Sequence, residues 1–230
     1  MTAFRFRALG GAALPLALAS LALSAPAQAQ DAGTIQIKAM GTAVLPDGKI
    51  TRVITDNIGL PALSQTRATD SVVPTVAVEY FPSPNFSIET ICCITPHDVR
   101  GTGGLNGAQL IENAIILPAT VTAKLHMDLG GGFKPYVGAG PTHFFIFSEG
   151  VGATAATLGA TDVNLSDDLG FALQAGFDVP LNDGGLGLSV DAKRYFVDTT
   201  ATFRAGNAVA LQSRHKLDPW VISAGVTFSF

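Results

Sequence analysis

The chain ends in the stretch WVISAGVTFSF, residues 220–230, and this stretch decides the fold. One alternate set of its positions holds Trp, Ile, Ala, Val, Phe and Phe, and the other set is almost wholly small or polar. Because successive side chains of a strand point to opposite faces, the stretch is a strand with one apolar face. Its length fits the roughly 9–11 residues that a tilted strand needs to cross a bilayer.

Aromatic residues mark both ends of this strand. Trp220 stands at its start, and Phe228 and Phe230 stand at its end. Transmembrane barrels carry girdles of aromatic side chains at both membrane interfaces. A terminal Phe on such a strand also resembles the signal that the outer-membrane assembly machinery reads. We therefore expect these three residues to mark the membrane-assembly strand of an exported barrel, with outer-membrane lipid and that machinery as partners.

The same alternation recurs in seven earlier segments. They are residues 34–42, 75–81, 86–94, 119–127, 136–147, 171–179 and 186–193. No apolar run after residue 30 approaches the roughly 18 residues of a transmembrane helix. Closed barrels are the other structures that satisfy every backbone group inside lipid. With the last strand the count is eight, an even number, which predicts an all-β, eight-stranded antiparallel transmembrane β-barrel.

The connections between these segments alternate between short and long. Residues 82–85, 128–132 and 181–185 are short turns, whereas residues 46–70, 96–113, 148–168 and 199–216 are long. Outer-membrane barrels have short periplasmic turns and long extracellular loops, so we expect both termini on the periplasmic side. The alternative is a soluble antiparallel barrel with its apolar face inside. Acids and lysines on the polar face, aromatic strand ends and the terminal Phe favour lipid outside.

Residues 1–29 have the layout of a cleaved secretory signal peptide. Arg5 and Arg7 form a basic start, residues 10–23 are apolar, and Ala27-Gln28-Ala29 offers small residues to a peptidase. Cleavage leaves residues 30–230 as one barrel domain in the outer membrane. Loss of Arg5 and Arg7 reduces the 14 basic residues to 12, against 18 acidic residues, a formal charge of −6. An acidic chain without a basic stripe has no footprint for nucleic acid.

The cysteines and histidines do not stand at the spacings that metal sites use, so we expect no metal ion and no cofactor. Cys92 and Cys93 are adjacent, so in a strand their side chains point to opposite faces. We favour two small, packed thiols over a vicinal disulfide, which needs unusual backbone geometry. The chain has no Cys-x-x-Cys pair and no Cys/His spacing typical of metal sites.

The histidines give no sign of an active site. His97 and His215 fall in long connections, where we expect solvated side chains. His126 shares a strand face with Asp128 near the periplasmic rim. A hydrogen-bonded rim pair is favoured over general-base machinery, because no nucleophile is marked beside it. We therefore predict no catalytic residue and no enzymatic activity.

The polar faces of the predicted strands carry a set of charged residues. These lumen candidates are Lys38, Glu79, Glu89, Lys124, Asp178, Asp191 and Lys193. Unpaired charges in a narrow, poorly hydrated lumen are costly, so we expect these residues to form ion pairs. The pairs either only plug and rigidify the barrel, or form a barrier that sends a passenger sideways into lipid. Pro141, flanked by Gly138 and Gly140, lacks the N–H for a ladder bond and is the candidate site of a lateral gap.

Residues 144–147, Phe-Phe-Ile-Phe, form an apolar cluster at the outer end of the segment 136–147. Alternation places Phe145 and Phe147 together on one face. That face is either a girdle in contact with lipid or a hydrophobic mouth that collects ligand, and the two interpretations are compatible. Phe145 and Phe147 are therefore candidates for a hydrophobic mouth.

Several short stretches in a fixed order resemble the OmpW family of outer-membrane proteins. They are Phe133-Lys134-Pro135-Tyr136-Val137-Gly138-Ala139-Gly140, Asp198-Thr199-Thr200-Ala201, Leu217-Asp218-Pro219-Trp220, Leu117-Pro118 and Asn85-Phe86-Ser87-Ile88-Glu89. The resemblance covers nearly all of the chain after the signal peptide and is densest after Phe133. Residues 51–69 and 99–112 diverge, so ligand or receptor specificity carried by such loops does not transfer.

The resemblance implies a monomeric barrel that acts as a narrow channel for small hydrophobic molecules. Members of the family also serve as surface receptors and antigens. A structural or receptor barrel with a plugged lumen is therefore the alternative function. An eight-stranded barrel has an interior just wide enough for side chains or one small ligand, which excludes a wide aqueous porin. We expect passive transport of a small hydrophobic solute.

Overall fold

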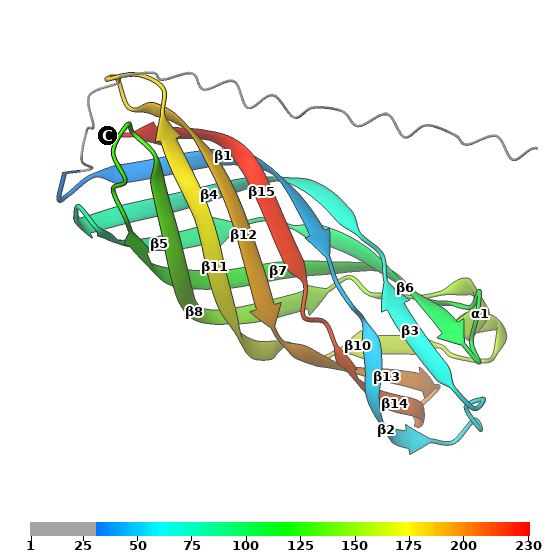
Figure 1. The fold of residues 1–230 in the computed structure, drawn as a ribbon. Coiled ribbons are helices and arrows are strands. Elements are labelled where there is room, and N and C mark those ends of the chain that lie inside the picture. The colour runs from blue at the N-terminus through cyan, green and yellow to red at the C-terminus, as the bar shows by residue number, and fades with distance from the viewer. Residues whose placement is uncertain (1–30) are drawn as a thin grey trace, which may run out of the picture.

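Eight antiparallel strands close into a barrel in the computed structural model, which describes residues 31–230 (Figure 1). The predicted signal peptide, residues 1–29, lies outside the described residues. The barrel strands are β1 (Ile35–Leu45), β4 (Ser71–Ser83), β5 (Phe86–Cys92), β7 (Gln109–His126), β8 (Lys134–Phe147), β11 (Asp168–Pro180), β12 (Leu186–Phe196) and β15 (Trp220–Ser229). Each strand pairs with the next around the circle, and β15 pairs with β1. The predicted eight-stranded fold is confirmed.

The two ends of the chain close the cylinder. In the register of β1 with β15, Ile37 lies opposite Phe228 and Leu45 lies opposite Trp220. The backbone N–H of Phe230 donates to the Ile35 carbonyl oxygen at 2.9 Å, and the Ile35 N–H donates back at 3.1 Å. The barrel therefore has no unpaired edge at the seam, which lipid would leave unsatisfied.

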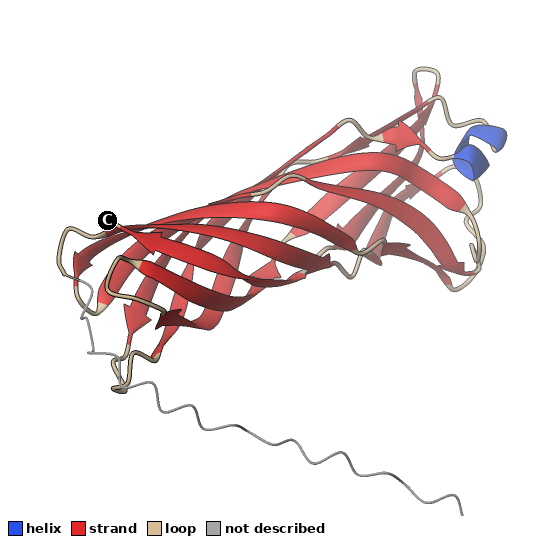
Figure 2. Ribbon diagram, turned by 90° about the horizontal axis from the view of Figure 1, so that it is seen from above, coloured by secondary structure: helices blue, strands red, loops and turns tan. Residues whose placement is uncertain are grey.

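Further strands and one short helix lie at the end of the barrel opposite Phe230 (Figure 2). The additional elements are β2 (Lys49–Asp56), β3 (Ser64–Ala68), β6 (Thr95–Gly103), β9 (Gly150–Val151), α1 (Ala153–Thr157), β10 (Asp162–Leu165), β13 (Asp198–Ala205) and β14 (Ala208–Lys216). Strands β10, β13, β14 and β2 form a four-stranded sheet, and β3 and β6 continue the barrel wall from β7. Across residues 31–230, no helix has the length and apolar character to cross a membrane.

The prediction that His97 and His215 are solvated is wrong. The paired strands of the extracellular end cover both side chains, which are 4% and 7% exposed. His97 Nδ1 lies 2.6 Å from the carbonyl oxygen of Thr69, and burial lowers the pKa of both rings. Both imidazoles are therefore neutral at pH 7. The long connections were predicted to be loops, but they contain strands. Several of these strands pair with a strand of another connection, as β3 does with β6 and β2 with β14, and alternation along the sequence does not identify such partners.

The two faces of each barrel strand have opposite polarity, as β4 shows. Val72, Val76 and Val78 point outward and are 80%, 50% and 42% exposed. On the other face of the same strand, Thr75 and Glu79 point into the barrel and are 2% and 0% exposed. A soluble barrel has the reverse arrangement, with the apolar face inside. The soluble-barrel alternative is therefore excluded, and the apolar outer face matches a lipid surface.

Depth in the membrane predicts a difference between two arginine substitutions on β4. Val78 lies near the middle of the strand, whereas Val72 lies six residues toward the extracellular end, roughly 20 Å along the strand. We expect Val78→Arg to lower the free energy of unfolding by about 2–4 kcal/mol and Val72→Arg by about 0–1 kcal/mol. Denaturant unfolding from lipid vesicles measures both values. Equal losses for the two variants would contradict the assignment of the lipid face.

Candidate functional site

The seven charged lumen candidates lie together inside the barrel and form one ion-pair network. Lys124 Nζ is 2.8 Å from Glu79 Oε2 and 2.9 Å from Glu89 Oε2. Lys38 Nζ contacts the same Glu79 oxygen at 2.9 Å and Asp178 at 3.2 Å. The two lysines thus share the Glu79 carboxylate, and their pairs with Glu79, Glu89 and Asp178 together join strands β1, β4, β5, β7 and β11 across the lumen.

Lys193 on β12 completes this network, which we call the charged layer. Its Nζ lies 3.0 Å from Glu89 Oε1 and 2.7 Å from Asp191 Oδ1. No side chain among the seven residues is more than 5% exposed. Three ammonium groups and four carboxylates therefore share a space without bulk water, where pairing is what makes their burial tolerable.

Two uncharged residues that the sequence reasoning did not single out fill the remaining space. Gln174 donates from Nε2 to Glu89 Oε1 at 2.9 Å and to Asp191 Oδ2 at 2.6 Å. The hydroxyl of Tyr136 donates to Asp191 Oδ2 at 2.8 Å, and the Tyr136 ring centroid is 3.7 Å from Lys124 Nζ. Both residues lie on the inward parity of their strands, and that parity is the signal that identifies them.

Two glycines make room for these side chains. A Cβ at position 176 would lie 2.5 Å from the Tyr136 hydroxyl oxygen, and one at position 138 would lie 2.8 Å from Lys124 Cγ. Gly176 and Gly138 therefore allow Tyr136 and Lys124 to lie across the lumen. The charged layer is packed to contact, and it separates the interior into a periplasmic part and an extracellular part.

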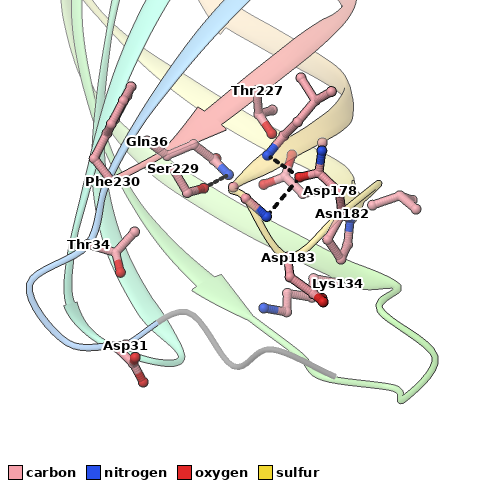
Figure 3. A pocket seen from close by; sticks show the side chains of 16 residues that line it. Asp31, Thr34, Gln36, Lys134, Asp178, Asn182, Asp183, Thr227, Ser229 and Phe230 are labelled. Carbon is pink, nitrogen blue, oxygen red and sulfur yellow. Dashed lines mark hydrogen bonds between the residues drawn. The ribbon is translucent and has the colours of Figure 1, made fainter. Parts of the chain in front are cut away.

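The periplasmic part is an open polar pocket of about 620 Å³ (Figure 3). Asp178, Asp183 and Lys134 line it, and Asp178 is also a member of the charged layer. Gln36 Nε2 donates to Ser229 Oγ at 3.2 Å along its wall. Its polar lining suits water rather than a hydrophobic molecule.

The extracellular part begins with buried hydroxyl pairs, such as Thr42 with Ser223, and is apolar beyond them. Val44, Ile116, Phe144 and Val221 lie above the charged layer and line a small space that we call the inner cavity. The ring of Phe144 contacts that of Tyr195, with centroids 5.4 Å apart. The barrel thus changes from a polar to an apolar interior along its axis.

The structure places Phe145 and Phe147 on the outer face of β8, where they are 40% and 41% exposed. The inward positions of the same segment belong to Phe144 and Ile146, which are 3% and 7% exposed. Alternation paired Phe145 with Phe147, and the register of the barrel decides which pair faces lipid. The apolar lining inside the mouth therefore comes from Phe144 and Ile146.

A second apolar space, the outer pocket, lies at the extracellular tip. Leu110, Leu158, Phe203 and Leu211 are among the apolar residues of its wall. Phe203 and Leu211 belong to the same buried cluster as Ile116 and Phe144, so one continuous apolar cluster joins the outer pocket to the inner cavity. Three polar residues, Thr66, Ser213 and His215, also line the outer pocket.

The barrel wall is interrupted beside the inner cavity. The register of β4 with β5 ends at the pair Val76–Cys92, and residues 71–75 pair only with β1. The next ladder on the other side begins at Thr95, which pairs with β7. Cys93 lies in this interval, lines the inner cavity and has the Thr75 side chain next to its thiol. We call residues 71–75 and 93–94 the wall break.

The glycine- and proline-containing part of β8 shows a different arrangement. The register of β7 with β8 skips from Thr120–Thr142 to Ala123–Ala139, so the ladder lapses at Gly140 and Pro141. A Cβ at Gly140 would nonetheless meet the backbone of β7, with 2.9 Å to the Thr122 Cα. The strands therefore touch at this point, and no space opens between them.

His126 does not have the contacts of a hydrolase triad, and the predicted pair with Asp128 is wrong. His126 Nε2 lies 2.8 Å from Ser87 Oγ and 3.0 Å from Glu79 Oε1, and Ser87 donates a short hydrogen bond to Glu79. In a hydrolase triad the acid holds Nδ1 while the nucleophile faces Nε2. Here both contacts fall on Nε2, and Ser87 is fully buried. Asp128 instead accepts from the Gly130 N–H at 2.9 Å and stabilises the turn.

Comparisons with known proteins identify the relatives of this chain. A model of the OmpW family matches residues 31–230. The uncharacterized outer-membrane protein y4mB of Sinorhizobium fredii is 31% identical over 98% of this chain and 92% of that protein. Outer membrane protein W of Vibrio cholerae is 29% identical over 94% of this chain and 97% of its own length.

Solved structures agree on the fold. The crystal structure of the outer membrane protein OprG from Pseudomonas aeruginosa superposes with a TM-score of 0.77 at 22% identity, over 88% of this chain and 98% of that one. The solid-state NMR structure of the outer membrane protein AlkL in lipid bilayers has a TM-score of 0.66 at 18% identity, over 100% and 97%. Both proteins are named as outer-membrane proteins, and the barrel of this chain likewise has an apolar outer face that matches lipid.

We expect the removal of one carboxylate from the charged layer to cause a large loss of stability. Glu89→Gln leaves Lys124 and Lys193 short of a counter-charge in a buried site, so we expect the free energy of unfolding to fall by about 3–5 kcal/mol. Asp183→Asn on the exposed periplasmic turn is the matched control, with an expected change within about 0.5 kcal/mol. Denaturant unfolding in vesicles measures both. A Glu89→Gln barrel as stable as the control would show that the layer does not depend on its pairing.

Proposed function

The chain belongs to the OmpW family, and from that premise we propose that this outer-membrane barrel is a narrow passive channel for small hydrophobic molecules. The observation that carries the proposal is the charged layer, which fills the lumen on the periplasmic side of the apolar cluster. The apolar side chains above the layer suit a hydrophobic molecule, whereas the buried charges of the layer do not. Passage along the axis to the periplasm would require such a molecule to separate buried ion pairs.

The apolar interior supplies the route from outside. A solute enters the outer pocket beside Phe203 and Leu211 and moves along the shared apolar cluster to Ile116 and Phe144. Each step keeps the solute in contact with apolar side chains, which favours it over water by about 25 cal/mol per Å² of buried apolar surface. The concentration gradient alone drives the movement.

The exit is the wall break, through which the solute reaches lipid sideways. The break borders the inner cavity at Cys93, and backbone pairing of residues 71–75 to the following strand is absent there. Val72 and Ile94 flank the break on the outer face and are 80% and 57% exposed. We place the exit here rather than at Gly140 and Pro141, because Gly140 packs against the β7 backbone.

A disulfide across the wall break tests this route. We expect Thr75→Cys, in a Cys92→Ser background, to bond to the native Cys93 under oxidising conditions and close the break. Uptake of hexane is measured in asymmetric vesicles whose outer leaflet is lipopolysaccharide. The oxidised lock should lower uptake to the rate of vesicles without protein, and a reductant should restore it.

The control lock joins two strands that are already paired. Thr42→Cys with Ser223→Cys, in a background without Cys92 and Cys93, links β1 to β15 where the two hydroxyl oxygens are 2.8 Å apart. This lock should leave hexane uptake unchanged. Equal uptake in the oxidised and reduced wall-break lock would sink the proposed exit.

The plugged lumen also supports a second candidate function, a surface receptor whose extracellular strands bind a partner. The charged layer alone fits this role equally well, because a receptor needs no path through the barrel. The uptake assay separates the two functions. A barrel that never raises hexane uptake above that of empty vesicles leaves the receptor function as the remaining proposal.

We further propose that the barrel acts as a monomer and that its last strand is read by the assembly machinery. Trp220, Phe228 and Phe230 all point outward and are 48%, 42% and 78% exposed. Phe230→Ala should therefore lower the amount of folded barrel in the outer membrane, measured by heat-dependent migration in gels. Phe196→Ala, an outward Phe on β12, is the control and should fold at the normal level. Normal yield of Phe230→Ala would argue against this signal.

A further inference from the structure

The outer pocket contains a polar group of three residues in an otherwise apolar wall. Thr66, Ser213 and His215 are 4%, 1% and 7% exposed, and they come from β3 and β14. None of the residues that line this pocket carries a full charge at pH 7, since burial lowers the pKa of His215 and keeps its ring neutral. A passive route for hydrophobic molecules does not require these three polar side chains, so we infer that they have a separate role.

The hydrogen bonds fix which atoms of this group carry protons. Thr66 Oγ1 donates to the Gly48 carbonyl oxygen at 2.5 Å, so its only proton is used. His215 Nδ1 lies 3.0 Å from the same Thr66 oxygen and must therefore donate to it. A neutral imidazole with a proton on Nδ1 has a lone pair on Nε2, which is 2.8 Å from Ser213 Oγ. The Ser213 hydroxyl thus donates to His215.

Ser213 therefore offers a hydrogen-bond acceptor, and no donor, to the pocket. Its proton is held by His215, whereas its oxygen retains lone pairs. A ligand with an O–H group can donate to this oxygen. A carboxylate would bring a negative charge to an acceptor in a pocket without a cationic residue, which is unfavourable. An alkane or an ether has no donor to offer.

From this geometry we propose that the outer pocket binds neutral aliphatic alcohols by their hydroxyl group, which donates to Ser213 Oγ. The pocket has a volume of about 110 Å³, and Ile58 and Leu158 in its lining are 52% and 69% exposed, so the pocket reaches the surface. A cavity of roughly 150 Å³ accepts benzene, so the space suits a short alkyl chain, and a longer tail extends through the opening. The proposal rests on the proposed function, because it places the first selective contact at the entrance of the hydrophobic route.

Two isomeric probes, 1-hexanol and methyl pentyl ether, test the proposal because they differ in the hydrogen-bond donor and match in size. The full mature chain is placed in lipid nanodiscs with methyl-labelled leucine, and the shifts of Leu110 and Leu211 are followed against the free aqueous concentration of each probe. We expect 1-hexanol to bind about three- to ten-fold more tightly than the ether, the effect of one neutral hydrogen bond. Hexanoate should cause no comparable shift.

Two variants locate the effect. Ser213→Ala removes the acceptor and should reduce the ratio of affinities to about one, while both probes still bind the apolar wall. Thr51→Ala removes an exposed hydroxyl outside the pocket, which donates to the Arg214 carbonyl oxygen, and should keep the wild-type ratio. The ratio of the two affinities in the wild-type protein can be measured even if a variant fails to fold, so this measurement is decisive by itself. A ratio of one in the wild type, or a ratio unchanged in Ser213→Ala, would overturn the proposal.

The result is independent of hexane uptake. A preserved preference for 1-hexanol in a protein that takes up no hexane would uphold the pocket and refute the route. Hexane uptake without any preference would uphold the route and refute the role of Ser213.

Discussion

The structure depends on one constraint, which is that charges buried in a narrow barrel must be paired. Lys38, Lys124 and Lys193 lie among four carboxylates within a lumen that has no room for bulk water. Isolated ions in such a space would be strongly destabilising, so each must contact several partners. Glu79 and Glu89 each accept from more than one lysine, and together with the pair Lys38–Asp178 these contacts tie six of the eight barrel strands together.

The same constraint divides the molecule along its axis. Below the charged layer the interior is polar and open to the periplasm, and above it the interior becomes apolar beyond a band of buried hydroxyl groups. Gly176 and Gly138 are part of this division, because larger side chains there would displace Tyr136 and Lys124 from the lumen. A solute that follows the apolar half therefore meets a polar barrier, and the interrupted pairing beside Cys93 offers the nearest way to lipid.

The extracellular end shows how a membrane barrel continues in water. Its strands leave the lipid and pair into a small sheet that encloses apolar side chains such as Phe203 and Leu211. Inside the membrane the apolar residues face outward, and in this extension they face inward. The inversion follows from the solvent, since lipid accepts apolar side chains and water does not. It also explains why His97 and His215, in segments that read as loops, are buried.

The alternation of residues by itself determined the eight strands, their opposite faces and the closure of the barrel by the stretch that ends at Phe230. These properties are local, because a strand repeats every two residues and its polarity is written in neighbouring positions. The same alternation placed the seven charged residues on the inward-facing positions of their strands. Only the tertiary structure decided which of them pair, since Lys38 and Asp178 lie 140 positions apart and meet only when the barrel closes. It also decided that Phe144 and Ile146, not Phe145 and Phe147, line the interior, because a register set by neighbouring strands turns one parity inward.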